Sequence, residues 1–155
     1  IFMKAKKDGY FADAAVINTE LITESKVLRQ DFYLEQIPKK EIKLDGIEYD
    51  FDSDKLRPVS MAILDELYEF LELNENLIVE INSHTDYKGS DKYNMNLSDR
   101  RAKSTVQYIL SKGIAKDRIS GKGYGESEPK VNCGDNCTEE EYAKNRRSEF
   151  LIVKK

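Results

Sequence analysis

The strand–turn–helix pattern at the centre of the chain most constrains what it can fold into. Residues 77–81, Leu-Ile-Val-Glu-Ile, form a compact apolar run, which is typical of a buried strand. Gly89 allows the backbone to turn sharply. An apolar stripe at helical spacing follows, at Ala102, Val106, Ile109 and Leu110. A buried strand that leads into an amphipathic helix predicts an α/β unit.

The same alternation of strand and helix patterns extends from residue 42 to the end of the chain. Pro58 suits the first turn of a helix that runs to about Leu73. Thr138 and Glu141 have the spacing of a capping box at the start of a short helix. Further strands are predicted within residues 42–51, from residues 118–121 onward, and at residues 150–153. Strands separated by helices predict an α/β (α+β) fold, in which helices cover one side of a partly parallel sheet.

Two opposite charges flank the central turn. Asp86 follows the strand, at the edge where open α/β sheets usually bind ligands. Ser98 is a plausible N-cap, so Arg101 is predicted in the first turn of the helix, where the dipole favours an anion. A guanidinium there can hold a carboxylate through two hydrogen bonds. Each charge could instead be solvated, but an anion and a cation on two rigid elements favour a site for a zwitterion, such as an amino-acid-like group.

The composition argues against several classes of protein. The net charge is −4, and Lys and Arg are interspersed with acids, which argues against nucleic-acid binding. No apolar run approaches the roughly 20 residues that cross a bilayer, and no signal peptide is visible. The chain begins at Ile1, within strand-like sequence, so it is interpreted as a fragment of a longer protein.

Catalysis is not predicted, and no metal or cofactor is expected. His84 is the only histidine, and no nucleophile pattern accompanies it, so a hydrogen-bonding structural role is favoured over acid–base chemistry. Residues 50–54 imitate the start of an EF-hand loop, but Lys55 and Met61 stand where that loop requires Gly and Glu. The G-x-G-x-G run at residues 121–125 is wrongly spaced for a dinucleotide-binding fingerprint.

Cys133 and Cys137 lie in a segment rich in Gly, Asp and Asn, which is predicted to be a loop. With a single distant histidine they make a poor zinc site, because structural zinc requires four ligands. A short disulfide, which suits an oxidising compartment, is favoured. A pair of free surface thiols is the alternative.

Residues 1–36 are predicted to be a β-rich fragment of a preceding domain, and residues 37–43 a linker. Asp8 and Gly9 mark a turn, and Pro38 with its neighbouring lysines favours a solvated connection. Apolar residues in one short run suggest a strand, at Leu28, Phe32 and Leu34. The run K-A-K-K-D-G-Y-F resembles the last strands of carboxypeptidase regulatory-like domains.

Three motifs follow one another across the second half of the chain: H-T-D-x-x-G-S-x-x-Y-N-x-x-L-S-x-x-R-A, G-I-x-x-x-R-I-x-x-x-G-Y-G-E-x-x-P and N-R-R-x-E-F. Together they resemble the OmpA-like peptidoglycan-binding domain family, over residues 44–155. The resemblance implies a β/α/β/α/β sandwich of helices on a mixed sheet. It also implies a non-catalytic domain that binds the peptide stem of peptidoglycan non-covalently at the periplasmic face of a Gram-negative outer membrane. Attachment to that membrane is then expected through parts of the protein outside this chain.

The resemblance assigns roles to individual residues. Asp86 and Arg101 occupy the positions that hold the diaminopimelate residue of the stem. Asn94 and Arg146 occupy the positions of supporting polar contacts. Further contacts are expected at the strand end and in the following turn, from Thr85, Tyr87 and Gly89.

Two departures from the family pattern qualify this assignment. Asp54, counted among the expected ligand-binding residues, stands where some relatives have a neutral Asn near the ligand. An added carboxylate there would either weaken binding of an acidic stem or face solvent. The loop that contains Cys133 and Cys137 looks like an insertion at the rim of the groove. Two alternative functions are a periplasmic protein–protein scaffold and a cell-wall hydrolase. The sequence shows no nucleophile motif that a hydrolase would need.

Overall fold

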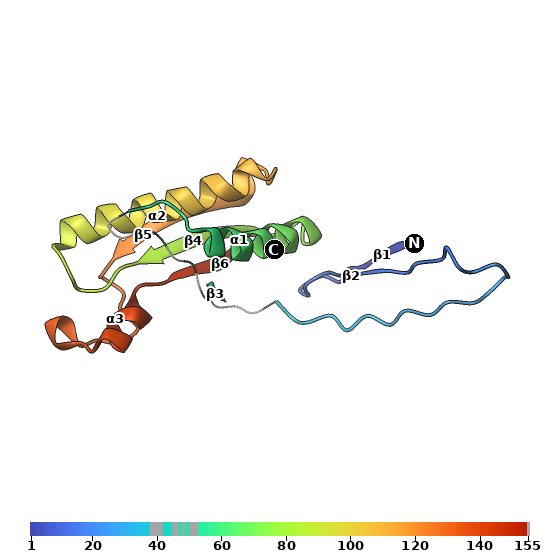
Figure 1. Cartoon of the computed structure of the whole chain (residues 1–155), viewed down its shortest axis with the longest axis horizontal. Helices are drawn as coiled ribbons and strands as arrows, with labels where there is room; N and C mark the ends of the chain where they lie inside the picture. The colour runs from blue at the N-terminus through green and yellow to red at the C-terminus, as the bar shows by residue number, and fades with distance from the viewer. Residues whose placement is uncertain (38–41, 45–46, 48, 50–52, 155) are drawn as a thin grey trace.

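A computed structural model gives the fold of the chain and describes residues 1–37, 42–44, 47, 49 and 53–154 (Figure 1). The strands are β1 (Phe2–Ala5), β2 (Asp13–Val16), β3 (Ile42–Leu44), β4 (Ile78–His84), β5 (Ile119–Gly125) and β6 (Ser148–Lys154). The α-helices are α1 (Pro58–Leu73), α2 (Asp91–Ser111) and α3 (Glu139–Asn145). Two short 3-10 helices are η1 (Lys116–Arg118) and η2 (Gly134–Asn136).

The main sheet is mixed and has the strand order β3-β6-β4-β5. Strands β4 and β5 are parallel, whereas β6 runs antiparallel to both β3 and β4. The apolar core lies between this sheet and the two long helices, and Figure 1 shows α2 lying along β5. Its buried members include Leu64, Leu67 and Leu71 of α1, Val79 and Ile81 of β4, Ile109 of α2, Ile119 of β5 and Phe150 of β6. The predicted α/β fold with a mixed sheet is confirmed.

The close approach of α2 to β5 explains the glycine run of that strand. A Cβ atom at Gly123 would overlap the backbone nitrogen of Asp99, and one at Gly121 would lie 3.0 Å from the carbonyl oxygen of Ala102. Side chains at these two positions would therefore push the helix away from the sheet. The glycines of β5 therefore allow close helix packing, a role that does not require the run to be a dinucleotide-binding motif.

The predicted start of α2 is wrong. The helix begins at Asp91, and its N-cap is Ser90, whose hydroxyl accepts a hydrogen bond from the backbone of Tyr93. Ser98 is buried inside the helix, where its hydroxyl donates to the carbonyl of Met95 and accepts from the amide of Gly125. Both serines suit an N-cap, and the exposed, polar residues that follow Ser90 conceal the helical period there. Arg101 therefore lies near the middle of α2, away from the dipole of its first turn.

The predicted ends of α1 and the predicted start of α3 agree with the structure. Helix α1 begins at Pro58 and ends at Leu73. Helix α3 carries the predicted capping box between Thr138 and Glu141. Gly113 follows the last turn of α2 with a φ of +117°, the left-handed conformation that a glycine supplies at a helix end.

The N-terminal segment forms a two-stranded antiparallel sheet of β1 and β2, with a turn at Gly9 as predicted. The strand predicted around Leu28 is absent, because described residues 17–35 are not paired with any other strand. Ile37, the first residue of the predicted linker, is 6 % exposed and belongs to the core. The remainder of that linker lies largely outside the described residues, so the division between the segments stays a prediction. Within the described part of the chain, the helices are too short or too polar to span a bilayer.

Candidate functional site

A cavity of about 750 Å³ lies at the carboxyl end of β4, between the turn that follows it and helices α2 and α3. Most of the predicted binding residues line it, namely Thr85, Asp86, Gly89, Asn94, Arg101 and Arg146. The fold thus brings together side chains from a strand end, a long helix and the end of a short helix. Lys88, within the turn from which contacts were expected, also lines it, but sequence reasoning missed other lining residues, including Tyr49, Tyr93 and Glu139.

Asp86 is buried, and its carboxylate is held from two sides. Oδ2 accepts a 2.6 Å hydrogen bond from Nη1 of Arg146, and Oδ1 accepts a 2.9 Å bond from the backbone amide of Lys88. The side-chain amide of Asn94 donates to the backbone carbonyl of Asp86. Asp86 therefore has a fixed orientation, and its ion-pair partner is Arg146 rather than Arg101.

Arg101 reaches the same cavity from α2, and only one of its guanidinium nitrogens donates a hydrogen bond within the described structure. Its Nε donates to the carbonyl of Ser53 at 3.1 Å, and its guanidinium lies over the ring of Tyr49, 4.8 Å from the centroid. Burial lowers the pKa of Arg101, but an arginine remains charged at any physiological pH. Among the described residues, no acceptor is recorded for its two terminal nitrogens. Those nitrogens can therefore donate to a carboxylate ligand.

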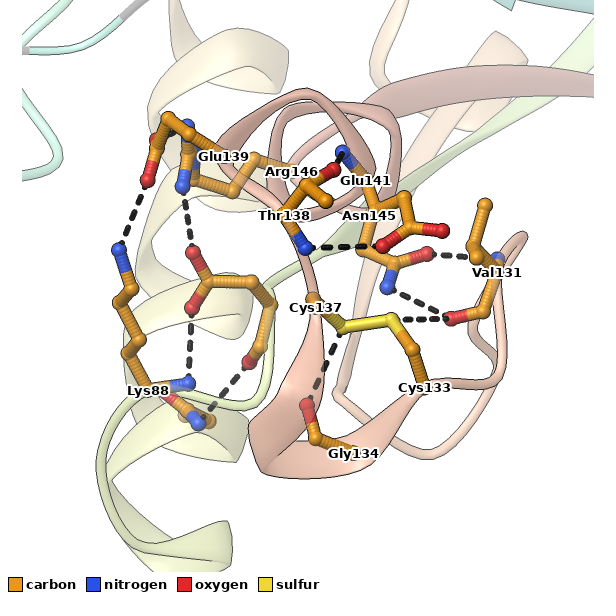
Figure 2. A network of polar contacts seen from close by, with 12 residues as sticks. Lys88, Val131, Cys133, Gly134, Cys137, Thr138, Glu139, Glu141, Asn145 and Arg146 are labelled. Atoms are coloured by element: carbon orange, nitrogen blue, oxygen red, sulfur yellow. Dashed lines mark hydrogen bonds and ion pairs between the residues drawn. A yellow bond between two sulfur atoms is a disulfide. The ribbon is translucent and has the colours of Figure 1, made fainter.

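Arg146 is one member of a closed ring of contacts between charged residues, called here the charged ring (Figure 2). Its Nη2 donates to Oε1 of Glu139 at 2.5 Å, and Oε2 of Glu139 accepts from Nζ of Lys88 at 2.9 Å. The backbone of Lys88 then returns to Asp86, which completes the ring. Partial burial lowers the pKa of Arg146, but its bonds to Asp86 and Glu139 outweigh that effect and raise the pKa overall. Arg146 thus stays charged and aimed at Asp86.

Thr85 and Asn94 supply uncharged polar groups to the cavity wall. The hydroxyl of Thr85 is buried and has no hydrogen-bond partner among the described residues. The amide of Asn94 is 1 % exposed and also donates to the carboxylate of Glu126. Gly89, with a φ of +113°, lets the chain turn above Asn94. The Thr85 hydroxyl is a buried polar atom that a ligand in this cavity could satisfy.

Two predicted contact residues lie off the cavity wall. Tyr87 points its hydroxyl toward the loop between β5 and α3, where it donates to the side chain of Asn132 at 3.2 Å. Asp54 is partly buried and is not among the residues that line the cavity. Their predicted ligand contacts stay predictions.

His84 is buried, directly before the site residue Thr85, and stacks on a neighbouring ring. It is 3 % exposed, its ring stacks on that of Tyr124 with centroids 5.2 Å apart, and neither ring nitrogen has a hydrogen-bond partner in the described structure. Burial, aided by the charge of Arg147, lowers its pKa to about 4. Nε2 of His84 lies 4.0 Å from Oε2 of Glu149, so the predicted hydrogen-bonding role stays a prediction. The aromatic and buried surroundings favour a neutral, stacked imidazole.

Cys133 and Cys137 form the predicted disulfide, with their Cα atoms 5.1 Å apart (Figure 2). The bond closes the loop between β5 and α3, directly before the N-cap residue Thr138. It lies beside the charged ring but contributes no residue to the cavity wall.

Comparison with known proteins gives related sequences and folds. Residues 48–146 match the model of the OmpA family. The chain is 40 % identical over 111 residues to outer membrane porin F of Pseudomonas fluorescens, a match that covers 72 % of this chain and 33 % of the relative. It is 42 % identical over 92 residues to outer membrane protein A of Escherichia fergusonii, a match that covers 57 % of this chain and 37 % of that relative. This chain therefore spans about a third of the length of these relatives.

A solved structure shares the fold. The peptidoglycan-associated lipoprotein from Burkholderia pseudomallei superposes with a TM-score of 0.61 at 23 % identity, over 68 % of this chain and 86 % of that one. The strand–helix arrangement that builds the cavity is therefore also found outside this sequence.

Proposed function

This chain belongs to the OmpA family, and from that premise we propose that it binds peptidoglycan non-covalently and anchors an outer-membrane protein to the cell wall. The proposed place is the periplasmic side of a Gram-negative outer membrane, with attachment to the membrane through other parts of the protein. The names of its relatives, outer membrane proteins and a peptidoglycan-associated lipoprotein, support this proposal. The disulfide supports it too, because such bonds persist in oxidising compartments.

The observation that carries the proposal is that one cavity holds both the fixed carboxylate of Asp86 and the guanidinium of Arg101, whose terminal nitrogens have no acceptor among the described residues. An ionised carboxylate can accept about four hydrogen bonds, and Asp86 has two recorded side-chain bonds. An arginine has five N–H donors, and only Nε of Arg101 has a recorded acceptor. A ligand ammonium can thus bind Asp86 while a neighbouring carboxylate binds Arg101.

We propose that the ligand group is the side chain of diaminopimelate in the peptide stem. Its distal carbon carries both an ammonium and a carboxylate, which matches Asp86 and Arg101. A lysine-containing stem has the ammonium alone and would leave the partly buried Arg101 without its anion. An unpaired desolvated group costs about 1–3 kcal/mol, so the cavity discriminates between the two stems.

No enzymatic activity is proposed. Hydrolysis requires a nucleophile or a water held by a general base, and His84, stacked on Tyr124, offers neither. Binding to another periplasmic protein is the second candidate. Phe11 and Ile37 pack against the core and hold the N-terminal segment against the domain. The exposed strands of that segment offer a surface for a protein partner. The kinship of residues 1–36 with carboxypeptidase regulatory-like domains stays a prediction.

Co-sedimentation with purified sacculi tests the proposed function. Asp86→Ala and Arg101→Ala should each abolish sedimentation, because each removes one of the two charges that hold the ligand. Arg100→Ala is the matched control, since Arg100 is the exposed neighbour of Arg101 and should leave binding unchanged. Sedimentation of both site variants at the native level would refute the assignment, and release of soluble muropeptides by the native domain would favour a hydrolase.

A further inference from the structure

The three residues of the N-R-R motif, Asn145 to Arg147, have two different roles. Arg146 points to Asp86, whereas its neighbours hold the loop that precedes α3. Oδ1 of Asn145 accepts from the backbone amide of Lys130. It also accepts from the amide of Val131, and Nδ2 of Asn145 donates to the carbonyl of Val131 (Figure 2). Asn145 is completely buried. The backbone that carries Arg146 is thus tied to the loop at residues 130–131.

Arg147 makes the second tie on the other side of Arg146. Its Nη2 donates to the carbonyl of Glu128, and its Nε donates to the buried carboxylate of Glu149. Both neighbours of Arg146 therefore fasten the C-terminal end of α3 to residues 128–131.

The disulfide fixes the other end of the same loop. Cys137 directly precedes Thr138, whose hydroxyl and backbone amide form the capping box of α3 with Glu141. Cys133 lies two residues after Val131, just beyond the tied segment. The bond between the two cysteines therefore links the start of α3 to the residues that directly follow the segment holding its end.

Glu139, the first residue of α3, connects this arrangement to the cavity. Its carboxylate binds both Arg146 and Lys88, although its side chain is 64 % exposed. The side chain of Arg146 is itself 38 % exposed. Two long and partly exposed side chains keep one geometry only if their backbones are fixed, because each would otherwise gain rotamer entropy.

We propose that the Cys133–Cys137 disulfide positions Arg146 through Glu139, and so keeps Asp86 in its ligand-binding orientation. The inference rests on the proposed function of the cavity. Opening the bond frees residues 134–138 from the tied segment, so the first turn of α3 and Glu139 can move away from Arg146. No cavity-lining atom is altered by that change, so any loss of affinity comes from positioning.

Calorimetric titration of a diaminopimelate-containing tetrapeptide tests the proposal. The double variant Cys133→Ala/Cys137→Ala is compared with the native domain well below the unfolding temperature of either. We expect Kd to rise roughly 3- to 10-fold, the size of coupling found within one side-chain network. An unchanged Kd in the double variant overturns the proposal, even if its melting temperature falls.

Glu139→Gln separates positioning from general stabilisation. If the disulfide acts through Glu139, this variant weakens binding by itself, and adding it to the cysteine variant produces little further loss. Independent effects that multiply would contradict the proposed route. Lys103→Ala, which removes an exposed ion pair with Asp99 on α2, is the control and should leave Kd unchanged.

A readout without ligand distinguishes failure of this inference from failure of the proposed function. The Nε–Hε NMR signal of Arg146 should shift and become more mobile when the disulfide is opened. An unchanged Arg146 signal refutes the positioning role whether or not the native domain binds the tetrapeptide. A native domain that does not bind, but whose Arg146 signal responds to the cysteine variant, refutes only the proposed ligand.

Discussion

Asp86 and Arg146 are joined by a 2.6 Å ion pair between side chains that stand 60 residues apart in the sequence. The Asp86 side chain is 8 % exposed, whereas that of Arg146 is 38 % exposed. The pair therefore lies at the boundary between the protein interior and the cavity, where it both orients the carboxylate and offsets the cost of its burial.

Replacing Arg146 tests this relationship. Arg146→Gln removes the ion pair and leaves the buried Asp86 carboxylate with one hydrogen bond among the described residues, from the backbone amide of Lys88. We predict a fall of about 1–2 kcal/mol in the free energy of unfolding, at the lower end for a buried charge because Arg146 is partly solvated. Urea denaturation measures the change. Arg100→Gln should have almost no effect, and equal effects of the two substitutions would contradict the structural role of the pair.

Stability should depend on the protonation of His84. Its pKa of about 4 in the folded state lies below the usual 6.5, so the unfolded chain binds the proton more tightly. The free energy of unfolding should therefore fall as the pH drops from about 6.5 to 4, by at most about 3 kcal/mol from this residue. The neighbouring charges of Arg147, Glu149 and Lys130 are part of the folded-state environment that sets this pKa.

His84→Phe isolates that contribution, because a phenyl ring can keep the stacking on Tyr124 without titrating. Denaturation across this pH range should give a flatter profile for the variant than for the native domain. Parallel profiles for the two proteins would show that His84 does not titrate between these values. Ligand binding at neutral pH should be the same in both, since the native imidazole is already neutral there.

The packing of α2 on β5 predicts a severe effect at Gly123. Gly123→Ala places a methyl group against the backbone of Asp99 and the hydroxyl of Ser98. The helix must shift, which should cost about 1–3 kcal/mol in stability and weaken ligand binding through Asn94 and Arg101 of the same helix. Ser120→Ala, at an exposed position of the same strand, is the control in thermal denaturation. A native-like melting temperature for Gly123→Ala would show that the helix is not held this closely.

The contact between the N-terminal segment and α1 is also testable. Asn74 is buried, its Oδ1 accepts a 2.7 Å hydrogen bond from the amide of Ala12, and its Nδ2 donates to the carbonyl of Phe70. Asn74→Ala should cost about 1–2 kcal/mol and speed hydrogen exchange at the Ala12 amide. Asn76→Ala, at an exposed position nearby, should change neither. Rapid exchange at Ala12 in the native domain would show that the segment is not docked.

Features with a local signal could be predicted from the sequence. Pro58 marks the start of α1, and the capping box of α3 needs only Thr138 and Glu141. Asp86 could be found because it lies two residues after the end of a recognisable strand. In each case the physical cause lies within a few residues of chain, so no tertiary contact has to be known.

Features that depend on tertiary contacts could not be predicted in the same way. Ser90 and Ser98 suit an N-cap equally, and the burial of Ser98 against Gly125 distinguishes them. Glu139 becomes part of the site only because the fold brings it beside Lys88, 51 residues earlier. The family resemblance supplied Arg146, but its ion pair with Asp86 follows from the packing of α3.

The central claim is that Asp86 and Arg101 together recognise an ammonium and a carboxylate on one ligand group. Calorimetric titration of the native domain and of Arg101→Ala, each with a diaminopimelate tetrapeptide and with its lysine analogue, tests it most directly. The account predicts that the native domain prefers the diaminopimelate peptide by roughly 5-fold or more, since pairing a partly buried Arg is worth about 1–3 kcal/mol. It also predicts that Arg101→Ala loses this preference. Equal affinity of the native domain for both peptides, or an undiminished preference in the variant, would contradict the account.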